Sequence, residues 1–275
     1  MLDILSAIIL GAVQGITEFL PISSSGHLVL IPQLLGVQTG LAFDTILHLG
    51  TLVAIFSFFW KDILRLIGGF IGSLIDITNG NFKKGIQNNI SKKFAWLLII
   101  GTIPTGIMGI LFKDAIESVF RGTIYVGVFL LITGLILYYS QRHSSGKVTT
   151  KEMTFKKSLI IGICQGLAIF PGISRSGATI ASGLCIGLER EYAARYSFLL
   201  SVPAVVGAGL IQIKDITSLD MSIVAIIAGF ISSIIFGYYS IKLLIKMIKG
   251  WSLDVFAYYC WIVGALTIIL TLIFG

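Results

Sequence analysis

Two stretches of this chain share one pattern: GAVQGITEFLPISSSG at residues 11–26 and GICQGLAIFPGISRSG at residues 162–177. Shifted by 151 positions, they match at eight of sixteen residues without a gap. Because the matching residues are of mixed types, an internal duplication explains them better than composition does. The sequence therefore predicts two repeats, at about 1–150 and 151–275.

The composition is typical of a membrane protein. Of the 275 residues, 56% are hydrophobic and only 12% are charged, and the mean hydropathy is +0.96. Soluble domains carry roughly 25% charged residues. The net charge of +7 does not indicate a nucleic-acid partner, because no basic patch with aromatic residues accompanies it. These values predict a single integral membrane domain.

Six stretches are apolar over roughly the 20 residues that spanning a membrane requires. They are 42–60, 94–112, 119–140, 192–212, 222–241 and 255–274. Two further apolar regions, 1–36 and 155–188, are interrupted by proline and polar residues, so that each half is too short to span. We expect each to enter the membrane, turn and return, which gives an all-α polytopic membrane protein with six transmembrane helices and two re-entrant helical hairpins.

Each repeat then holds one hairpin and three spans. Three is odd, so we expect an inverted-topology repeat, as in many secondary transporters. If the region after residue 60 is cytoplasmic, the outer loops hold only Lys113, Arg121 and Lys214, and the positive-inside rule places both termini outside. The cytoplasmic side then receives 16 of the 20 basic residues: Lys61, Arg65, Lys83, Lys84, Lys92, Lys93, Arg142, Lys147, Lys151, Lys156, Lys157, Arg190, Arg195, Lys242, Lys246 and Lys249.

An acid lies at the end of the first apolar segment. Glu18 follows Gln14 by four residues, so both lie on one helix face. An ionisable residue at membrane depth is costly and marks a functional site by default. The alternative is a glutamate at a helix end that reaches the interface. We take Glu18 as a candidate catalytic residue, with Gln14 in support.

Serines and a histidine follow the first interruption. Ser23, Ser24 and Ser25 can cap the returning helix, whose first free N–H groups form an anion site. His27 comes nine residues after Glu18 across the turn, and a histidine with a carboxylate beside it is the usual general acid–base pair. Plain helix capping and a satisfied buried histidine are the alternatives.

The second interruption contains an arginine. Arg175 has no charge partner in its own segment, and a guanidinium at depth favours a carboxylate or phosphate bound through two oxygens. Ser174, Ser176 and Thr179 add hydroxyl groups beside it. An ion pair with Glu18 is the alternative. Two helix N-termini, an arginine and several hydroxyls that converge from opposite faces favour a phosphate site.

Asp44 and His48 lie four residues apart at the outer start of a predicted span. They contribute to the same site or simply lie at the membrane interface. The sequence does not choose between these two interpretations.

These motifs together resemble the undecaprenyl-diphosphate phosphatase family, also called bacitracin-resistance proteins. The family signatures are Glu/Gln-x-x-x-Glu, Ser-Ser/Thr-Gly-His and Pro-Gly-x-Ser-Arg-Ser-x-x-Thr. This chain carries them as Gln14–Glu18, Ser24–His27 and Pro171–Thr179, and the likeness covers essentially its whole length. Where many members have a glutamate this chain has Gln14, so Glu18 is the only acid of the first motif.

The resemblance implies a hydrolase that converts undecaprenyl diphosphate to undecaprenyl phosphate and inorganic phosphate. This reaction recycles the lipid carrier for peptidoglycan synthesis and gives bacitracin resistance. The resemblance also implies a bacterial plasma-membrane location, an active site open to the outer face, and a divalent cation, Mg²⁺ or Ca²⁺.

The expected roles leave some alternatives open. Glu18 orients His27 or holds the metal, and either Ser24 or a water molecule attacks, with His27 as the base. The terminal phosphate is expected to be bound by Ser23, Ser25, Ser174, Arg175, Ser176 and Thr179.

Two other classes of function compete with a hydrolase. A transporter or flippase of an anionic lipid or solute would use the same inverted repeat without breaking a bond. A structural membrane subunit would not explain two costly polar interruptions. The presence of Glu18 together with His27 favours a catalytic function over transport, because a site that only binds an anion gains little affinity from an acid. Membrane lipids and the polyprenyl diphosphate are the expected partners, and a homodimer is left open.

Overall fold

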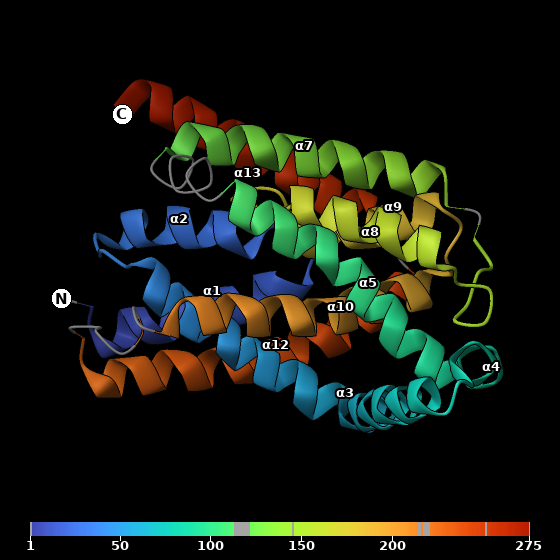
Figure 1. The fold of residues 1–275 in the computed structure, drawn as a ribbon. Helices are drawn as coiled ribbons and strands as arrows, with labels where there is room; N and C mark the ends of the chain where they lie inside the picture. Colours follow the sequence, from blue (N-terminus) through green and yellow to red (C-terminus); the bar gives the residue numbers. More distant parts are fainter. Residues whose placement is uncertain are drawn as a thin grey trace.

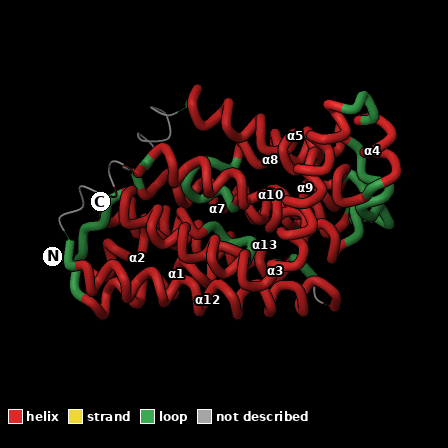
Figure 2. The backbone as a smooth tube through the Cα atoms, turned by 60° about the horizontal axis from the view of Figure 1, so that its bottom comes forward, coloured by secondary structure: helices red, strands yellow, loops and turns green. Residues whose placement is uncertain are grey.

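The computed structural model describes residues 2–112, 122–144, 146–213, 216, 221–250 and 252–274. Within these residues the regular elements are helices, and the only β-type pairing is one isolated bridge between Val148 and Leu188 (Figures 1 and 2). This confirms the all-α class. The described helices are α1 (Ile4–Phe19), α2 (Ser24–Leu35), α3 (Leu41–Thr78), α4 (Phe82–Asn88), α5 (Ile90–Leu111), α7 (Thr123–Arg142), α8 (Phe155–Leu167), α9 (Arg175–Cys185), α10 (Arg190–Ile211), α12 (Ile223–Gly250) and α13 (Asp254–Phe274).

Six of these helices are long and apolar enough to cross a membrane: α3, α5, α7, α10, α12 and α13. Each overlaps most of one predicted span, so the prediction of six spanning helices in a multi-pass membrane protein is confirmed. The start of the predicted span 119–140 lies outside the described residues, as do Lys113, Arg121 and Lys214.

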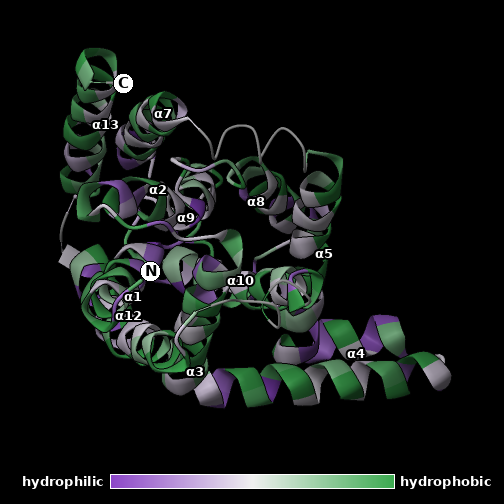
Figure 3. Ribbon diagram, turned by 90° about the vertical axis from the view of Figure 1, so that its left-hand side faces the viewer, coloured by the Kyte–Doolittle hydropathy of each residue, from purple (hydrophilic) through white to green (hydrophobic). Residues whose placement is uncertain are grey.

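Two spanning helices are longer than predicted. The region after residue 60 is not a loop, because α3 continues to Thr78 beyond a kink at Phe59, where φ is −105° and ψ is 22°. Likewise α12 continues past 241 to Gly250. Hydropathy marks the stretch that fits hydrocarbon, whereas a helix continues as long as its residues favour it. In Figure 3 the second half of α3 projects from the body, with α4 beside it.

Each of the two interrupted regions is divided into two short helices. The chain breaks between α1 and α2 around Pro21, and between α8 and α9 around Pro171–Gly172. Both second helices begin with the same cap: the Ser23 hydroxyl accepts from the Gly26 amide, and the Ser174 hydroxyl accepts from the Gly177 amide. Such caps satisfy N–H groups that the helix itself leaves free.

Each first helix of these pairs packs against a spanning helix from the other half of the chain. Helix α1 lies along α12, and α8 lies along α5. Small residues permit this approach, because a side chain on Gly11 would collide with the Gly229 carbonyl, and one on Gly162 with the Gly101 carbonyl. Close backbone contact through small residues is the usual way in which helices associate in lipid, where burial of apolar surface drives little.

The two ends of the molecule differ. Both termini lie at one end, whereas α4 and the connection between α7 and α8 lie at the other (Figure 1). Seen from the end that carries the termini, the outward faces of most helices are hydrophobic, and α4 carries a hydrophilic face (Figure 3). The outward faces therefore suit lipid, and the polar residues of the two helix breaks lie inside.

Candidate active site

A buried carboxylate lies at the centre of the polar interior. Glu18, in the last turn of α1, is only 5% exposed. Its Oε2 accepts hydrogen bonds from Gln14 Nε2 at 2.9 Å and from Ser24 Oγ at 2.6 Å. The Gln14 bond follows from the four-residue spacing on one helix face. The Ser24 bond crosses the break between α1 and α2, so the turn itself brings the hydroxyl to the acid.

Arg175 approaches the same carboxylate from the other half of the chain. Its Nη2 donates to Glu18 Oε1 in a salt bridge. Its Nη1 is buried and has no hydrogen-bond partner among the described residues. A buried donor without a partner costs free energy comparable to a lost hydrogen bond, so it marks a place where a ligand atom would be favourable.

Ser24 and Arg175 occupy equivalent places in the two helix breaks. Each is the first residue of its helix, directly after a capping serine. The positive ends of the α2 and α9 dipoles therefore both point at the region around Glu18. A carboxylate is stabilised there, and so is any other anion that comes close.

The turn that carries Ser24 is held in an unusual conformation. Ser23 has a φ of +69°, the left-handed region that side chains other than glycine seldom adopt. Its hydroxyl accepts from the amides of Gly26 at 3.3 Å and Gly172 at 3.1 Å, so it ties the two breaks together. Gly172 needs its own φ of +102°, and a side chain there would collide with the Val126 carbonyl. Such strain persists only where surrounding contacts hold it, often at functional sites.

The other predicted phosphate-binding hydroxyls are engaged within the protein. Ser174 Oγ accepts from the Gly177 amide at 3.0 Å and lies 3.2 Å from Ser176 Oγ. Thr179 Oγ1 donates to the Arg175 carbonyl at 2.8 Å. Ser25 Oγ lies 3.4 Å from Ser23 Oγ, at the long end of hydrogen-bond distances. These hydrogen bonds stiffen both turns, and the contact of these hydroxyls with phosphate stays a prediction.

His27 is buried close to this region but faces away from it. Its Nδ1 lies 2.7 Å from the Ser23 carbonyl, and its Nε2 lies 2.7 Å from Tyr259 Oη on α13. A carbonyl oxygen only accepts, so Nδ1 carries the hydrogen and Nε2 accepts from the tyrosine. Ser24 donates to Glu18 and not to this imidazole. The predicted pairing of His27 with Ser24 or Glu18 is therefore not what the geometry favours.

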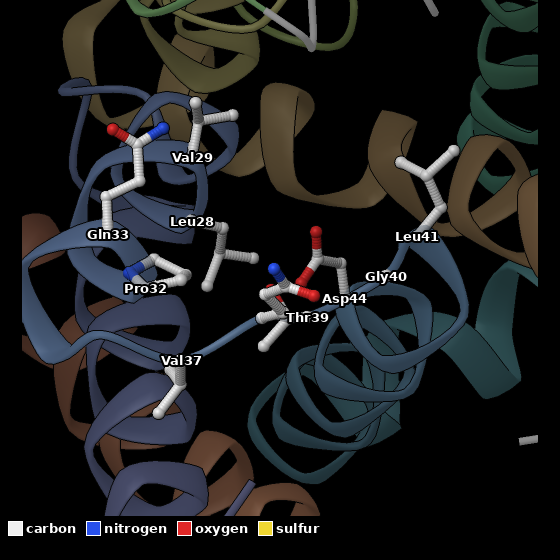
Figure 4. A pocket seen from close by; sticks show the side chains of 10 residues that line it. Leu28, Val29, Pro32, Gln33, Val37, Thr39, Gly40, Leu41 and Asp44 are labelled. Carbon is white, nitrogen blue, oxygen red and sulfur yellow. The ribbon is translucent and has the colours of Figure 1, made fainter. Parts of the chain in front are cut away.

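A different histidine contacts the carboxylate. His48 Nε2, on α3, lies 3.5 Å from Glu18 Oε2, and its Nδ1 lies 2.8 Å from the Asp44 carbonyl. Asp44 also lines a cavity of about 470 Å³ between the end of α2 and the start of α3 (Figure 4). Leu28, Val29, Pro32, Val37 and Leu41 form its apolar walls. The end of α2 and the start of α3, which line this cavity, lie towards the end of the molecule that carries the termini (Figure 1).

The sequence reasoning named His48 and Asp44 without choosing a role for them, and it missed Tyr259. Tyr259 lies in an aromatic part of α13 whose composition fits any lipid-facing helix. No local signal distinguishes it, because its partner His27 is 232 positions away in the chain.

The donors around Glu18 do not form a protein-built metal site. Both carboxylate oxygens are already engaged by Gln14, Ser24 and Arg175. The unpartnered Oε1 of Gln14 is a single neutral oxygen, whereas Mg²⁺ and Ca²⁺ favour several oxygen ligands that include carboxylates. Within the described residues no group of three histidine, cysteine, aspartate or glutamate side chains could hold an ion. Glu18 thus contacts Arg175 through one oxygen and Gln14 and Ser24 through the other.

Comparison with known proteins agrees with the motifs. The family described as "Bacitracin resistance protein BacA" matches residues 7–266. A protein named undecaprenyl-diphosphatase from Methanosphaera stadtmanae is 74% identical over 99% of this chain and 100% of its own length. Relatives with the same name from Methanobrevibacter smithii and Halothermothrix orenii are 51% and 45% identical, over 96% and 99% of this chain and 96% and 100% of their own lengths. With its family motifs gathered around Glu18, this chain belongs to the bacitracin resistance protein BacA family.

Proposed function

We propose that this chain hydrolyses undecaprenyl diphosphate to undecaprenyl phosphate and inorganic phosphate. One observation carries the proposal: Ser24 and Arg175, each the first residue of its helix, contact the same buried carboxylate. A hydroxyl nucleophile, a proton acceptor and a guanidinium for the phosphate are then in one place. In the cell the reaction recycles the lipid carrier for peptidoglycan synthesis and gives resistance to bacitracin.

The chemistry proceeds in two displacements. The Ser24 oxygen attacks the terminal phosphorus while its proton passes to Glu18 Oε2, 2.6 Å away. The bond from that phosphorus to the bridging oxygen breaks, and the lipid monophosphate leaves. Water then hydrolyses the phosphoserine, which releases inorganic phosphate and restores the hydroxyl.

Arg175 stabilises the phosphoryl group during both displacements. Nη2 stays on Glu18, and the free Nη1 is available to an equatorial phosphate oxygen. Charge-assisted donors aimed at the transferring group are usually the largest catalytic term. The dipoles of α2 and α9 add to this effect. Ser23, Ser25, Ser174, Ser176 and Thr179 support the site by fixing the two turns.

The divalent cation that the resemblance implies is proposed to arrive with the substrate. Mg²⁺ commonly binds substrate phosphates and keeps much of its water shell, so it needs few protein ligands. A cation on the diphosphate would neutralise part of its charge as it enters the polar interior.

Movement of an anionic lipid without hydrolysis is the competing function, and the relatives' names do not favour it. The deciding experiment measures phosphate release from undecaprenyl diphosphate by the purified protein in detergent, with a chelator and after re-addition of Mg²⁺ or Ca²⁺. We expect release that the chelator abolishes and the cation restores. Lipid binding without any phosphate release would contradict the proposal.

The two halves of the chain are proposed to form an inverted repeat whose re-entrant pairs, α1–α2 and α8–α9, meet near the membrane midplane. The matching caps of α2 and α9 support this arrangement. The reciprocal packing of α1 on α12 and of α8 on α5 supports it as well. With an odd number of spans in each half, the two pairs enter from opposite sides.

We propose that the termini and the cavity beside Asp44 face outwards from the plasma membrane. A reporter enzyme fused after residue 148 is then expected to be active only in the cytoplasm, because the positive-inside rule retains the basic loops there. A fusion at the C-terminus serves as the matched control and should report the outer side. An external signal from the fusion at 148 would reverse the orientation, and with it the side on which the site opens.

A further inference from the structure

The three histidines of this chain share one local geometry. In each, ring Nδ1 lies close to the backbone carbonyl four residues earlier, at 2.7 Å in His27, 2.8 Å in His48 and 3.0 Å in His143. Because a carbonyl oxygen only accepts, Nδ1 is the nitrogen that carries a hydrogen in the neutral ring. The proton that each ring gains or loses is therefore bound at Nε2.

The group that Nε2 faces differs among the three histidines. In His27 it accepts from Tyr259 Oη, with the two rings stacked at 5.8 Å between centroids. In His143 the ring is exposed and stacks on Tyr139 at the end of α7. Only His48 directs this nitrogen at a residue of the reacting cluster, Glu18 Oε2, at 3.5 Å.

We propose that His48 is the histidine that accepts and returns the proton of this reaction, through Glu18. The inference rests on the proposed phosphatase activity. Glu18 Oε2 lies between the two partners, 2.6 Å from Ser24 Oγ and 3.5 Å from His48 Nε2. The carboxylate therefore connects the nucleophile to a ring nitrogen whose lone pair is free when the ring is neutral.

The proton is conserved along this path. As the Ser24 oxygen bonds to phosphorus, its proton moves to Glu18 Oε2, and Glu18 passes it to His48 Nε2. The ring becomes an imidazolium held by Glu18 on one nitrogen and by the Asp44 carbonyl on the other. The imidazolium then returns the proton through Glu18 to the leaving monophosphate oxygen, and the neutral ring serves again when water attacks the phosphoserine.

The surroundings of His48 suit this role. Its side chain is 28% exposed, whereas that of Glu18 is 4% exposed, so the histidine is the more accessible of the two groups. Three charged or titratable residues surround it. Glu18 on α1 contacts the ring, Arg175 on α9 contacts Glu18, and Asp44 lies on the same helix as His48. Asp44 Oδ1 is buried without a partner among the described residues and lines the neighbouring cavity.

The test compares H48Q with wild type and with H143Q, which changes an exposed histidine of the same local geometry. Loss of a general acid–base group is expected to lower kcat by roughly a hundredfold or more, with KM changed less than about threefold. The pH profile of kcat should differ between wild type and H48Q. Added imidazole should partly restore H48A. H143Q should match wild type throughout.

The outcomes separate this inference from the proposed function. Absence of phosphate release in the wild-type protein overturns the phosphatase proposal itself. Active wild type together with H48Q that keeps more than about a third of kcat and the same pH profile overturns the role of His48. A loss in H48Q that is equal at every pH, without imidazole rescue of H48A, also overturns it, because it indicates a structural role.

A second measurement decides the matter if H48Q does not fold. Wild-type protein is treated with diethyl pyrocarbonate, and modified histidines are mapped by mass spectrometry against remaining activity. Loss of activity is expected to follow modification of His48 and to be slowed by substrate. Activity that survives full modification of His48 overturns the proposal.

Discussion

Replacing Arg175 with lysine is expected to lower kcat by at least about a hundredfold, although the positive charge is kept. In the structure one guanidinium nitrogen holds Glu18 while the other is buried without a partner. A lysine can take over the pairing with Glu18, but its single ammonium cannot hold the carboxylate and a phosphate oxygen along two fixed directions. The loss corresponds to about 3–4 kcal/mol of transition-state stabilisation.

Arg195→Lys is the matched control for this change. Arg195 also forms a salt bridge with a carboxylate, that of Asp62. The Arg195 side chain is 44% exposed, so its guanidinium has no buried partner. We expect this control to keep wild-type kcat and KM. If Arg175→Lys keeps more than about a third of wild-type kcat, Arg175 supplies only charge or structure.

The spanning helices could be predicted from sequence because lipid imposes one simple rule. Every backbone polar group must be satisfied within the segment, so a long apolar stretch is a helix. The ends of α3 and α12 could not be predicted in this way. After residue 60 the sequence contains the charged residues Lys61 and Arg65, so it no longer has the hydropathy of a spanning segment. The helix nevertheless continues to Thr78. No proline or glycine accompanies the kink at Phe59, so the sequence does not predict it.

The centre of the site was also predictable, because Glu18 and Arg175 are costly to bury and each lacks a partner of opposite charge nearby in the sequence. In the structure they form the ion pair that the sequence left as the alternative to a phosphate site, with Ser24 at the matching position. The orientation of the His27 ring was not predictable. His27 follows Ser24 by three residues, but its Nδ1 is held by the Ser23 carbonyl and its Nε2 is turned to Tyr259. Spacing along a chain does not specify the direction of a ring nitrogen.

Replacing Ser24 with alanine is expected to abolish turnover while the protein still binds the lipid diphosphate. The Ser24 hydroxyl donates to Glu18 at 2.6 Å and is mostly buried, so it is already oriented and largely removed from water before the substrate arrives. If serine is the nucleophile, wild-type protein should also form a phosphoserine that mass spectrometry detects when the reaction is quenched early.

Two other roles for Ser24 lead to different results. If water attacks, alanine removes one hydrogen bond to Glu18, and substantial activity should survive. If the hydroxyl only stabilises the fold, the variant should lose about 1 kcal/mol of stability with its chemistry intact, the usual size of one lost hydrogen bond. Rate, lipid binding and thermal unfolding must therefore be measured on the same preparation, together with Ser57→Ala, which removes an exposed hydroxyl bonded only to the Val53 carbonyl.

The structure favours attack by Ser24 because of what Glu18 already contacts. One of its oxygens is engaged by Arg175, and the other accepts from Gln14 and Ser24, with His48 at 3.5 Å. A water molecule would compete with three donors already bound to Glu18, whereas the Ser24 hydroxyl already donates to Oε2. A folded Ser24→Ala variant that keeps more than about a tenth of the wild-type rate, a loss of less than roughly 1.4 kcal/mol, would exclude serine as an essential nucleophile.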